Sequence, residues 1–488
     1  MPEALSSHPL RVLAVASEAY PLVKTGGLAD VVGALPAALA RENVHVRTLL
    51  PGYPAVMRAI GAAAVAHSYS DLFGGPATVR LASAGGLDLA VVDAPHLYAR
   101  DGGPYAAANG EEFADNAFRF AALARVGADI GRGAIAQFVP AVVHAHDWQA
   151  ALAPAYLHYD GGARPATVTT LHNLAFQGRF PGVTLDMLRL PWHAWSLDGV
   201  EYHGAIGYLK AGIALADRVT TVSPTYAAEI RTPEGGMGLD GLLRHRAHVL
   251  RGILNGIDDT VWDPATDARI PSHFNAARRA GRARNRVALR KRMELSPLPD
   301  APLFGVVSRF SWQKGLDLVL EALPSILRGG GQLAMLGSGD RGLEQACAEA
   351  ARAHPGRVAL QLGYDEDLAH LMQAGSDVIL VPSRFEPCGL TQMCALRYGT
   401  LPLVARVGGL ADTVVDANDA AVAAGVATGF QFSPVTVAEL AFAIDRAHAV
   451  WKDPPRWRRL QARAMATDVS WRHSAQQYAQ LYREIAPR

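Results

Sequence analysis

The pentapeptide Gly-Gly-Leu-Ala-Asp occurs twice in this chain, at residues 26–30 and at residues 408–412. Each copy follows a short apolar run and opens a stretch with helical periodicity. Paired glycines at such a position let backbone N–H groups approach a ligand closely, with the positive end of a helix dipole behind them. Lys24 and Thr25 add a cation and a hydroxyl before the first copy. The pattern predicts two anion-binding loops, but two ordinary strand-to-helix turns would have the same local sequence.

Two cations follow an apolar, β-branched run in the second half of the chain. Arg309 comes just after this run, and Lys314 stands five residues later, before a helical stretch. The planar fork of Arg and the point charge of Lys together suit a diphosphate. The alternative is that Arg309 pairs with a buried carboxylate.

The run from Pro382 to Thr391 places a carboxylate next to a predicted helix start. The N–H groups of Gly389, Leu390 and Thr391 would be unpaired donors there, which makes a seat for a phosphate. Glu386 would lie beside that seat and hold the hydroxyls of a sugar, or it could simply cap the helix.

The length and net charge of the chain limit the classes of protein to which it can belong. A chain of 488 residues favours two large domains. The formal net charge is +1, with 46 basic and 45 acidic side chains, so no broad field favours nucleic acid or an anionic membrane. The local basic clusters at 278–292 and 456–463 have helical spacing, and we interpret them as solvated helix faces.

The cysteines and the N-terminus point to the cytoplasm. Cys347, Cys388 and Cys394 lack metal-ligand spacing and cannot all pair, which fits a reducing compartment. The first nine residues lack the features of a signal peptide, and no apolar run reaches the roughly 20 residues of a membrane span.

Short β-branched runs alternate with helical patterns in both halves, which predicts α/β domains with mostly parallel sheets covered on both faces. The predicted strands are 10–16, 44–50, 87–92, 141–146, 166–171, 218–222, 249–254, 303–308, 332–336, 358–362, 378–381 and 401–405. The predicted helices include 28–41, 111–130, 206–216, 435–450 and 470–485, with a capping box at Thr436 and Glu439. Between the halves, residues 256–271 are polar and rich in turn formers, which is typical of a linker.

Polar residues also follow two predicted strands of the first half, in the segments 144–149 and 171–178. His144 and His146 have a spacing that could bind a metal, but no third ligand has a suitable position. A core histidine is the ordinary interpretation of His144.

The order and spacing of these motifs resemble bacterial glycogen synthases and plant starch synthases over nearly the whole chain. The matching segments are 24–30, 146–148, 171–173, 255–258, 308–309, 313–315, 384–392 and 408–413, with weaker matches at 209–212, 222–226 and 238–242. No single segment is decisive, but the joint order is specific.

The resemblance implies the GT-B architecture, in which two Rossmann-like doubly wound domains flank an interdomain cleft. It implies a first domain over residues 1–257, a nucleotide-sugar-binding domain over 258–467, and a C-terminal helix over 468–488 that crosses back to the first domain. It also implies retaining, metal-independent transfer of glucose from ADP-glucose to the non-reducing end of an α-1,4-glucan such as glycogen, with no cofactor.

The family roles transfer to matching positions of this chain. The catalytic set implied is Glu386, Arg309, Lys314, His172 and Asp147. The donor-binding set implied is Lys24, Gly26, Gly27, Asp30, Asn255, Arg309, Lys314, Tyr364, Cys388, Gly389, Leu390 and Thr391. Tyr105, Trp192 and Trp195 are candidates for the acceptor side, although the tryptophans could equally serve packing.

Several of these assignments leave alternatives open. Tyr364 would stack on adenine, or it is an ordinary partly buried tyrosine. Cys388 is either a modification-sensitive thiol or a small buried filler, which is the common fate of cysteine. Retention favours front-side attack, in which the departing phosphate takes the acceptor's proton, over a covalent intermediate on a carboxylate, because no second nucleophile is evident.

Three rival functions share parts of the pattern. A GT-B transferase with a UDP- or GDP-sugar donor would share Arg309, Lys314 and Glu386 but does not explain Lys24 and its glycines. A catalytically silent glucan-binding scaffold would not need these charged groups. A pyridoxal-phosphate glucan phosphorylase would be much longer.

Overall fold

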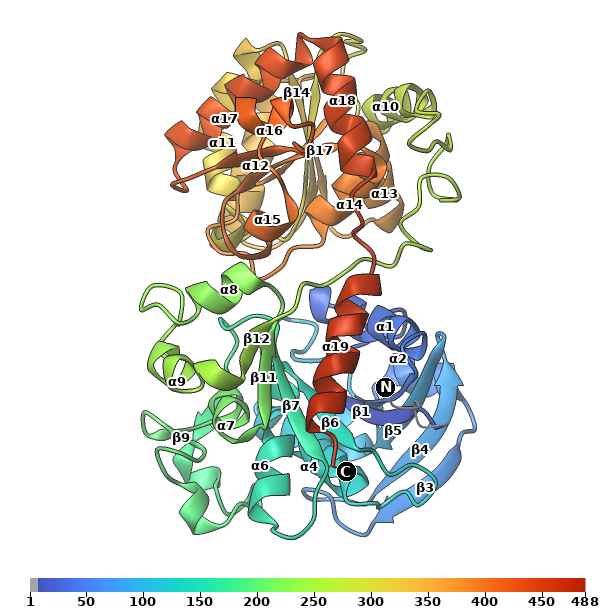
Figure 1. The fold of residues 1–488 in the computed structure, drawn as a ribbon, viewed down its shortest axis with the longest axis vertical. Helices are drawn as coiled ribbons and strands as arrows, with labels where there is room; N and C mark the ends of the chain where they lie inside the picture. Colours follow the sequence, from blue (N-terminus) through green and yellow to red (C-terminus); the bar gives the residue numbers. More distant parts are fainter. Residues whose placement is uncertain (1–7, 488) are drawn as a thin grey trace, which may run out of the picture. The chain divides into compact units, whose positions relative to one another are not determined.

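The computed structural model describes residues 8–487, and the chain divides into two compact units (Figure 1). The first unit contains the residues up to Asn255 and those from Trp471 onward. The second unit is Gly256–Ser470.

The first unit is built on a nine-stranded sheet with the order β12-β11-β7-β6-β1-β2-β5-β4-β3. Its strands are β1 (Leu10–Val15), β2 (Val44–Pro51), β3 (Ala64–Tyr69), β4 (Ala77–Ala84), β5 (Leu87–Asp93), β6 (Val142–His146), β7 (Ala166–Leu171), β11 (Arg218–Thr221) and β12 (Leu250–Gly252). The strands from β12 to β5 pair in parallel, whereas β4 pairs antiparallel with β5 and with β3. A separate small sheet holds β8 (Arg179–Pro181), β9 (Glu201–Tyr202) and β10 (Ala205–Gly207).

The parallel strands were predictable because both of their faces are buried; every residue of β6 and β7 is buried. The sequence analysis missed β3 and β4. The turn from β4 to β5 contains Gly85 and Gly86, both with positive φ, so a Gly-Gly hairpin signal was present in the sequence. The exposed edge strand β3 lacks the apolar run that marks the others.

Helices flank this sheet. They are α1 (Gly27–Ala40), α2 (Pro54–Ile60), α3 (Pro95–Tyr98), α4 (Asn116–Gly131), α5 (Asp147–Ala150), α6 (Leu152–Tyr159), α7 (Tyr208–Leu215), α8 (Pro224–Glu229), α9 (Asp240–His245) and α19 (Arg472–Ile485), with 3₁₀ turns at Gly182–Thr184, Trp192–Ala194 and Ala247–Val249. Helix α4 begins five residues later than the predicted start at residue 111, because Glu112 bridges to Ala106 in a loop. Helix α19 packs on α1, and its Tyr478 and Tyr482 share a core cluster with Val12 and Val31 (Figure 1).

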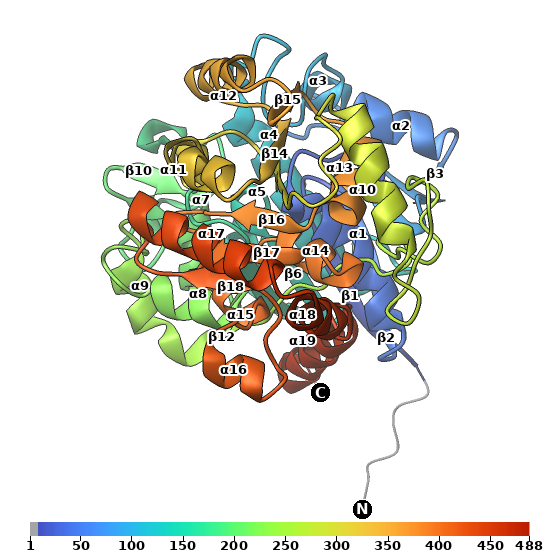
Figure 2. The same cartoon turned by 90° about the horizontal axis from the view of Figure 1, so that it is seen from above.

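The second unit holds a six-stranded, all-parallel sheet with the order β15-β14-β13-β16-β17-β18 (Figure 2). Its strands are β13 (Leu303–Val307), β14 (Gln332–Gly337), β15 (Val358–Leu362), β16 (Val378–Val381), β17 (Leu401–Ala405) and β18 (Phe430–Phe432). Its helices are α10 (Gly281–Arg292), α11 (Leu316–Arg328), α12 (Arg341–Ala353), α13 (Glu366–Gly375), α14 (Thr391–Tyr398), α15 (Gly408–Thr413), α16 (Asp419–Ala423), α17 (Val437–Trp451) and α18 (Pro454–Met465), with a 3₁₀ turn at Trp312–Lys314. The Thr436 hydroxyl caps α17 by accepting the N–H of Glu439.

Two expectations about this unit need correction. Residues 256–271 are not a free linker, because they belong to the second unit and Asp267 is buried there, bonded to His370 and Tyr398. The basic cluster on α10 is not wholly a solvated face. Arg282 and Arg290 are buried and donate to backbone carbonyls, because burial of a cation requires its N–H groups to be satisfied.

Candidate active site

A carboxylate and a lysine meet at the carboxyl edge of the second unit's sheet. Lys314, in the turn after β13, donates from Nζ to Glu386 Oε2 at 2.5 Å. The hydroxyl of Ser383, after β16, donates to the same oxygen at 2.8 Å. Glu386 is 6% exposed. Among the described residues, no side chain caps helix α14, so the alternative in which Glu386 caps that helix is wrong.

The loops after β13 and β16 are tied to each other by backbone and side-chain bonds. The Arg384 N–H donates to the Gln313 carbonyl at 2.8 Å, and Gln313 Nε2 donates to the Phe385 carbonyl at 3.2 Å. The Arg384 guanidinium pairs with Asp317 and lies over the ring of Trp312. These contacts fix Lys314 and Glu386 on one rigid frame, as expected where the carboxyl ends of neighbouring parallel strands meet.

Unused donors lie beside this frame. Within residues 8–487, the N–H groups of Gly389, Leu390 and Thr391 have no acceptor. The Thr391 hydroxyl lies 3.5 Å from the Val307 carbonyl, which places the start of α14 at the end of β13. Gly389 has φ +73°, which favours glycine at this turn. The sequence predicted these three open donors.

Arg309 is exposed, and its guanidinium makes no hydrogen bond or ion pair with the described part of the chain. The alternative in which it pairs with a buried carboxylate is therefore wrong. An exposed guanidinium next to the frame is available to an anion.

The second Gly-Gly-Leu-Ala-Asp copy does not face open space. A Cβ added to Gly408 would lie 2.0 Å from the Glu386 carbonyl oxygen, and one added to Gly409 would lie 2.4 Å from Cys388 Cα. The Gly409 N–H donates to the Glu386 carbonyl at 3.1 Å. The prediction that this copy forms an anion-binding loop is wrong; it packs against the turn that carries Glu386.

The first copy, in the first unit, is open. A Cβ added to Gly26 would meet nothing within 4 Å, and the N–H groups of Gly26 and Gly27 have no acceptor within residues 8–487. Lys24 pairs with Asp30 at 2.8 Å, and its ammonium lies 5.4 Å from the ring centre of Tyr20. In this structure, the Asp30 carboxylate therefore forms an ion pair with Lys24.

A buried carboxylate that the sequence analysis missed anchors this loop. Glu18 is 2% exposed and accepts both the N–H of Thr25 and its hydroxyl, the latter at 2.6 Å. The Tyr105 hydroxyl also donates to Glu18 and lies 2.8 Å from the Ser17 hydroxyl. Tyr105 thus positions the loop through Glu18. The available signal was an acidic residue just after the first buried strand.

Asp147 and His172 lie together at the ends of β6 and β7. Asp147 Oδ1 accepts the N–H of His172 at 2.7 Å and that of Asn173 at 3.4 Å. Its backbone has φ +57°, a conformation that non-glycine residues seldom adopt and that is common at functional sites. Burial raises the pKa of Asp147 to about 7, because the charged form loses its hydration.

Three imidazoles form a column through this edge of the sheet. His172 Nε2 lies 3.0 Å from His146 Nδ1, and the rings of His146 and His144 are 4.0 Å apart. His144 is bonded to Tyr482 and Thr170, so it is a satisfied core histidine. Burial lowers the pKa of His146 to about 3 and also lowers those of His144 and His172, so the three rings are neutral at pH 7.

The remaining predicted residues differ in exposure. Tyr364 is 75% exposed, so it is not a partly buried tyrosine, and its ring face is available for stacking. Trp192 is 81% exposed, whereas Trp195 rests on Gly182, where an added Cβ would lie 2.4 Å from its ring. Cys388 is buried, which favours the filler interpretation. Asn255 is buried, and its Oδ1 has no partner among the described residues.

No group of three His, Cys, Asp or Glu side chains within residues 8–487 could hold a metal ion. In the same part of the chain, no helix combines the length and apolar character needed to cross a membrane.

Comparison with known proteins decides the family. Residues 11–245 match the model of the starch synthase catalytic domain, and residues 290–463 match that of glycosyl transferases group 1. The chain is 61% identical over 473 residues to a glycogen synthase of Rhodopseudomonas palustris (strain BisB18), which covers 97% of each chain. The chain belongs to the family of glycogen and starch synthases. A glycogen synthase of Acidiphilium cryptum is 58% identical over 98% of this chain and 100% of that protein.

The solved structure of a starch synthase agrees with the fold. The catalytic domain of starch synthase IV from Arabidopsis thaliana, bound to ADP and acarbose, matches with a TM-score of 0.88 and 33% identity over 98% of this chain and 100% of that one. A sucrose-phosphate synthase from Thermosynechococcus elongatus matches at 18% identity with a TM-score of 0.59, a likeness of fold alone. The predicted GT-B architecture of two Rossmann-like units is thus confirmed.

Proposed function

We infer that the protein is a retaining glucosyltransferase that moves glucose from ADP-glucose to the non-reducing end of an α-1,4-glucan and releases ADP, as a step of glycogen synthesis. The observation that carries this inference is the frame of Lys314 and Glu386 beside the exposed Arg309 and the open N–H groups at the start of α14. Family membership over nearly the whole chain supports it.

The second unit supplies the groups that the leaving diphosphate needs. Negative charge develops on this group as the glycosidic C–O bond breaks. Arg309, Lys314 and the N–H groups of residues 389–391 are assigned to stabilise it, in place of a metal ion. The N–H groups of residues 389–391 are fixed and need no reorganisation when the charge appears, whereas Lys314 has to turn from Glu386 to the phosphate. Glu386 is then free to accept hydroxyls of the glucose ring.

The first unit supplies groups for the donor and for the opposite charge. Lys24 and the open amides of Gly26 and Gly27 are assigned to the donor, and exposed Tyr364 of the second unit to its adenine. Asp147 and the backbone carbonyl of His172 are assigned to the positive charge that develops on the sugar ring. Since the three histidines are neutral, Asp147 is the ionisable group that can balance this charge.

The proton of the acceptor hydroxyl needs a base. Asp147 accepts two backbone N–H groups, and Glu386 is held by Lys314 and Ser383, so neither is placed as a free nucleophile. Front-side attack, with the departing phosphate oxygen as the base, is therefore favoured over a covalent intermediate.

Incubation of the protein with glycogen and radiolabelled ADP-glucose or UDP-glucose tests the function. We expect label in polymer from ADP-glucose, and undiminished transfer after a chelator is added. Label from UDP-glucose alone would assign a different donor, and no transfer from either would favour a silent glucan-binding protein. Loss of transfer on chelation would contradict the metal-free mechanism.

A further inference from the structure

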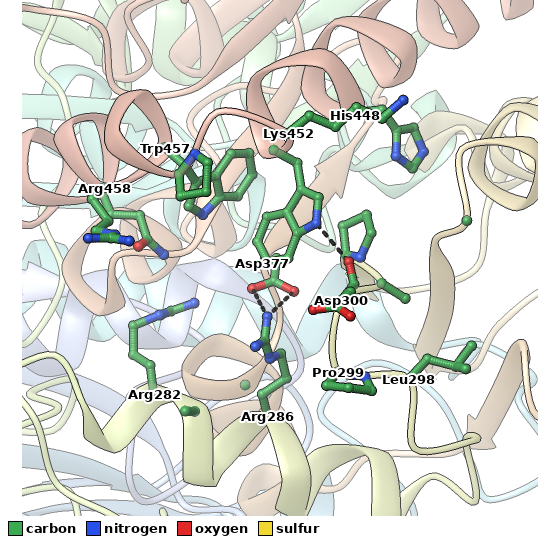
Figure 3. A pocket seen from close by; sticks show the side chains of 18 of the residues that line it. Arg282, Arg286, Leu298, Pro299, Asp300, Asp377, His448, Lys452, Trp457 and Arg458 are labelled. Carbon is green, nitrogen blue, oxygen red and sulfur yellow. Dashed lines mark hydrogen bonds and ion pairs between the residues drawn. The ribbon is translucent and has the colours of Figure 1, made fainter.

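A cavity of about 1070 Å³ opens in the second unit, and none of its lining residues is among those assigned to the donor. Figure 3 shows the side chains that line it. Pro302 and Asp377, which line it, directly precede β13 and β16. Arg309 and Glu386 follow those same strands. The cavity thus lies at the amino edge of the sheet, about 15 Å from the carboxyl edge for strands of this length.

The cavity is strongly cationic. Its lining includes Arg279, Arg282, Arg286, Lys452 and Arg458, against the two carboxylates of Asp300 and Asp377. In Figure 3, Arg282 and Arg286 rise from α10 on one side, while Lys452 and Arg458 come from the turn after α17 and from α18 on the other. Two helices distant in sequence thus direct positive groups to one space, which favours an anion.

Two of these arginines are poorly neutralised. Arg282 is buried and donates only to neutral acceptors, including the Ser376 carbonyl at 2.6 Å, and burial lowers its pKa to about 10. Arg286 contacts Asp377 at no less than 3.3 Å, and Asp377 also accepts the N–H of Leu303 at 2.9 Å. A phosphate would complete the hydrogen bonding that Asp377 leaves weak at Arg286.

The cavity also offers a ring surface. Trp451 is held by a bond from its Nε1 to the Asp300 carbonyl at 2.9 Å and packs edge-on against Trp457. His448 and Trp457 also line the cavity, but the nitrogens His448 Nε2 and Trp457 Nε1 are enclosed by protein and do not open into it. Burial lowers the pKa of His448, so this ring is neutral at pH 7. An indole ring beside concentrated positive charge suits a ligand that carries both a ring and an anionic group.

We propose that this cavity is a second ligand site, which binds a phosphomonoester of a ring-bearing small molecule, either a nucleotide or a sugar phosphate. The phosphate is bound by Arg286 and Arg458, and the ring lies against Trp451. The sequence analysis interpreted the basic clusters at 278–292 and 456–463 as solvated helix faces. Under this proposal, Arg286 and Arg458 of these clusters bind a ligand instead.

Calorimetric titration of the full chain with adenosine 5′-monophosphate, ribose 5-phosphate and inorganic phosphate tests the site. We expect at least one of the two ring-bearing probes to bind at least tenfold more tightly than inorganic phosphate. Stronger binding of the nucleotide would identify base stacking, and equal binding of the two would identify the sugar phosphate as the recognised part. No binding of either, or equal affinity for inorganic phosphate, would overturn the proposal.

Variants separate this cavity from the donor residues. Arg286→Ala should weaken binding at least tenfold. Arg458→Ala should also weaken it and carries little risk to folding, because the Arg458 side chain is exposed and makes no hydrogen bond or ion pair within the described structure. The matched control Arg284→Ala changes an exposed residue of the same helix outside the cavity and should have no effect. Binding that is kept in both cavity variants but lost in Lys314→Ala would assign the probes to the donor residues and overturn the proposal.

Discussion

The same five residues, Gly-Gly-Leu-Ala-Asp, stand in open space in one unit and in tight packing in the other. At Gly26 an added Cβ would meet no atom within 4 Å, whereas at Gly409 it would lie 2.4 Å from the backbone of Cys388. The first copy opens α1, a helix of 14 residues, and the second opens α15, which has six. The same sequence thus leaves backbone donors open in one place and supports the turn that carries Glu386 in the other.

The contrast between open and enclosed groups extends to the charged residues. Arg309 is exposed and unpaired within the described chain, like the open glycines, whereas Glu386 is enclosed by Lys314, Ser383 and the second pentapeptide. Substitution of an open group should therefore change kinetics alone. Substitution of an enclosed group should change stability as well.

The largest effect is expected at the open guanidinium. Arg309→Ala should lower kcat for glucosyl transfer by about 10²–10³, because it removes a fixed donor for the leaving diphosphate. The free energy of unfolding should change by less than about 0.5 kcal/mol, as is usual for exposed groups without partners. Steady-state kinetics and thermal unfolding check the two parts. Arg341→Ala, at another exposed arginine of this unit, is the control. A kcat close to that of the unaltered protein would remove Arg309 from the mechanism.

The next largest effect is expected at the enclosed glycine. Gly409→Ala should destabilise the second unit by about 1–3 kcal/mol, because the new methyl group overlaps the Cys388 backbone and nothing flexible can yield. Glucosyl transfer should fall with it, since the same turn carries Glu386. Urea unfolding followed by circular dichroism gives the change. Unaltered stability would mean that the second copy is not a packing element, which would break the comparison.

A smaller, purely kinetic effect is expected at the open glycine. Gly26→Ala should raise KM for ADP-glucose about tenfold, because the new methyl group keeps the phosphate from approaching the backbone N–H groups and so weakens one hydrogen bond to a charged group, about 1.5 kcal/mol. Its stability should match that of the unaltered protein, because the methyl group meets no atom. Gly61→Ala would be a poor control, since that residue has positive φ and would add backbone strain. If Gly26→Ala lowered the free energy of unfolding as much as Gly409→Ala, the first copy would be a packing element like the second, and the contrast between an open and an enclosed copy would be wrong.

The mildest effect concerns pH. Because burial raises the pKa of Asp147 to about 7, its carboxylate is lost as the pH falls through 7. We assign the ionised form to the stabilisation of the sugar cation, so kcat should rise with pH through about 7 and level off above it. Asp147→Asn should lower the plateau and abolish this step in the pH profile. An unchanged step in that variant would assign the ionisation to another group.

Much of the fold follows from local sequence. The parallel strands β7, β15 and β17 match the predicted bounds, because each is a short run rich in apolar or β-branched residues that ends at a polar or turn residue. The antiparallel strands β3 and β4 were not predicted, because apolar and polar residues alternate only weakly along them. In α10, the sequence alone did not indicate which arginines are buried. Arg282 can be buried because it donates to the carbonyl groups of residues 376 and 398, which lie far along the chain.

The candidate site was predictable in its residue types but less so in its contacts. The open donors at Gly26 and at residues 389–391 follow from glycines before helices. The Lys314–Glu386 pair could not be read locally, because it joins groups that lie 72 residues apart in two different loops. The bond from Thr25 to the buried Glu18 lies within one loop, but the sequence does not reveal how that loop turns back on itself. The second pentapeptide shows this limit of sequence-based prediction most clearly. Its sequence does not indicate that it packs against the backbone of residues 386–388.

The position of α19 has a consequence for how the chain folds during translation. Six residues from 471 to 482, Tyr478 and Tyr482 among them, complete a core cluster whose other buried members lie between residues 12 and 253. Tyr482 also bonds to His144, the last ring of the histidine column. The ribosome makes this helix only after the entire second unit has been synthesised. Until α19 has been synthesised, part of the first unit's core therefore stays exposed to solvent, although most of that unit has already been made. A nascent chain stalled before residue 471 would expose the same apolar surface to chaperones.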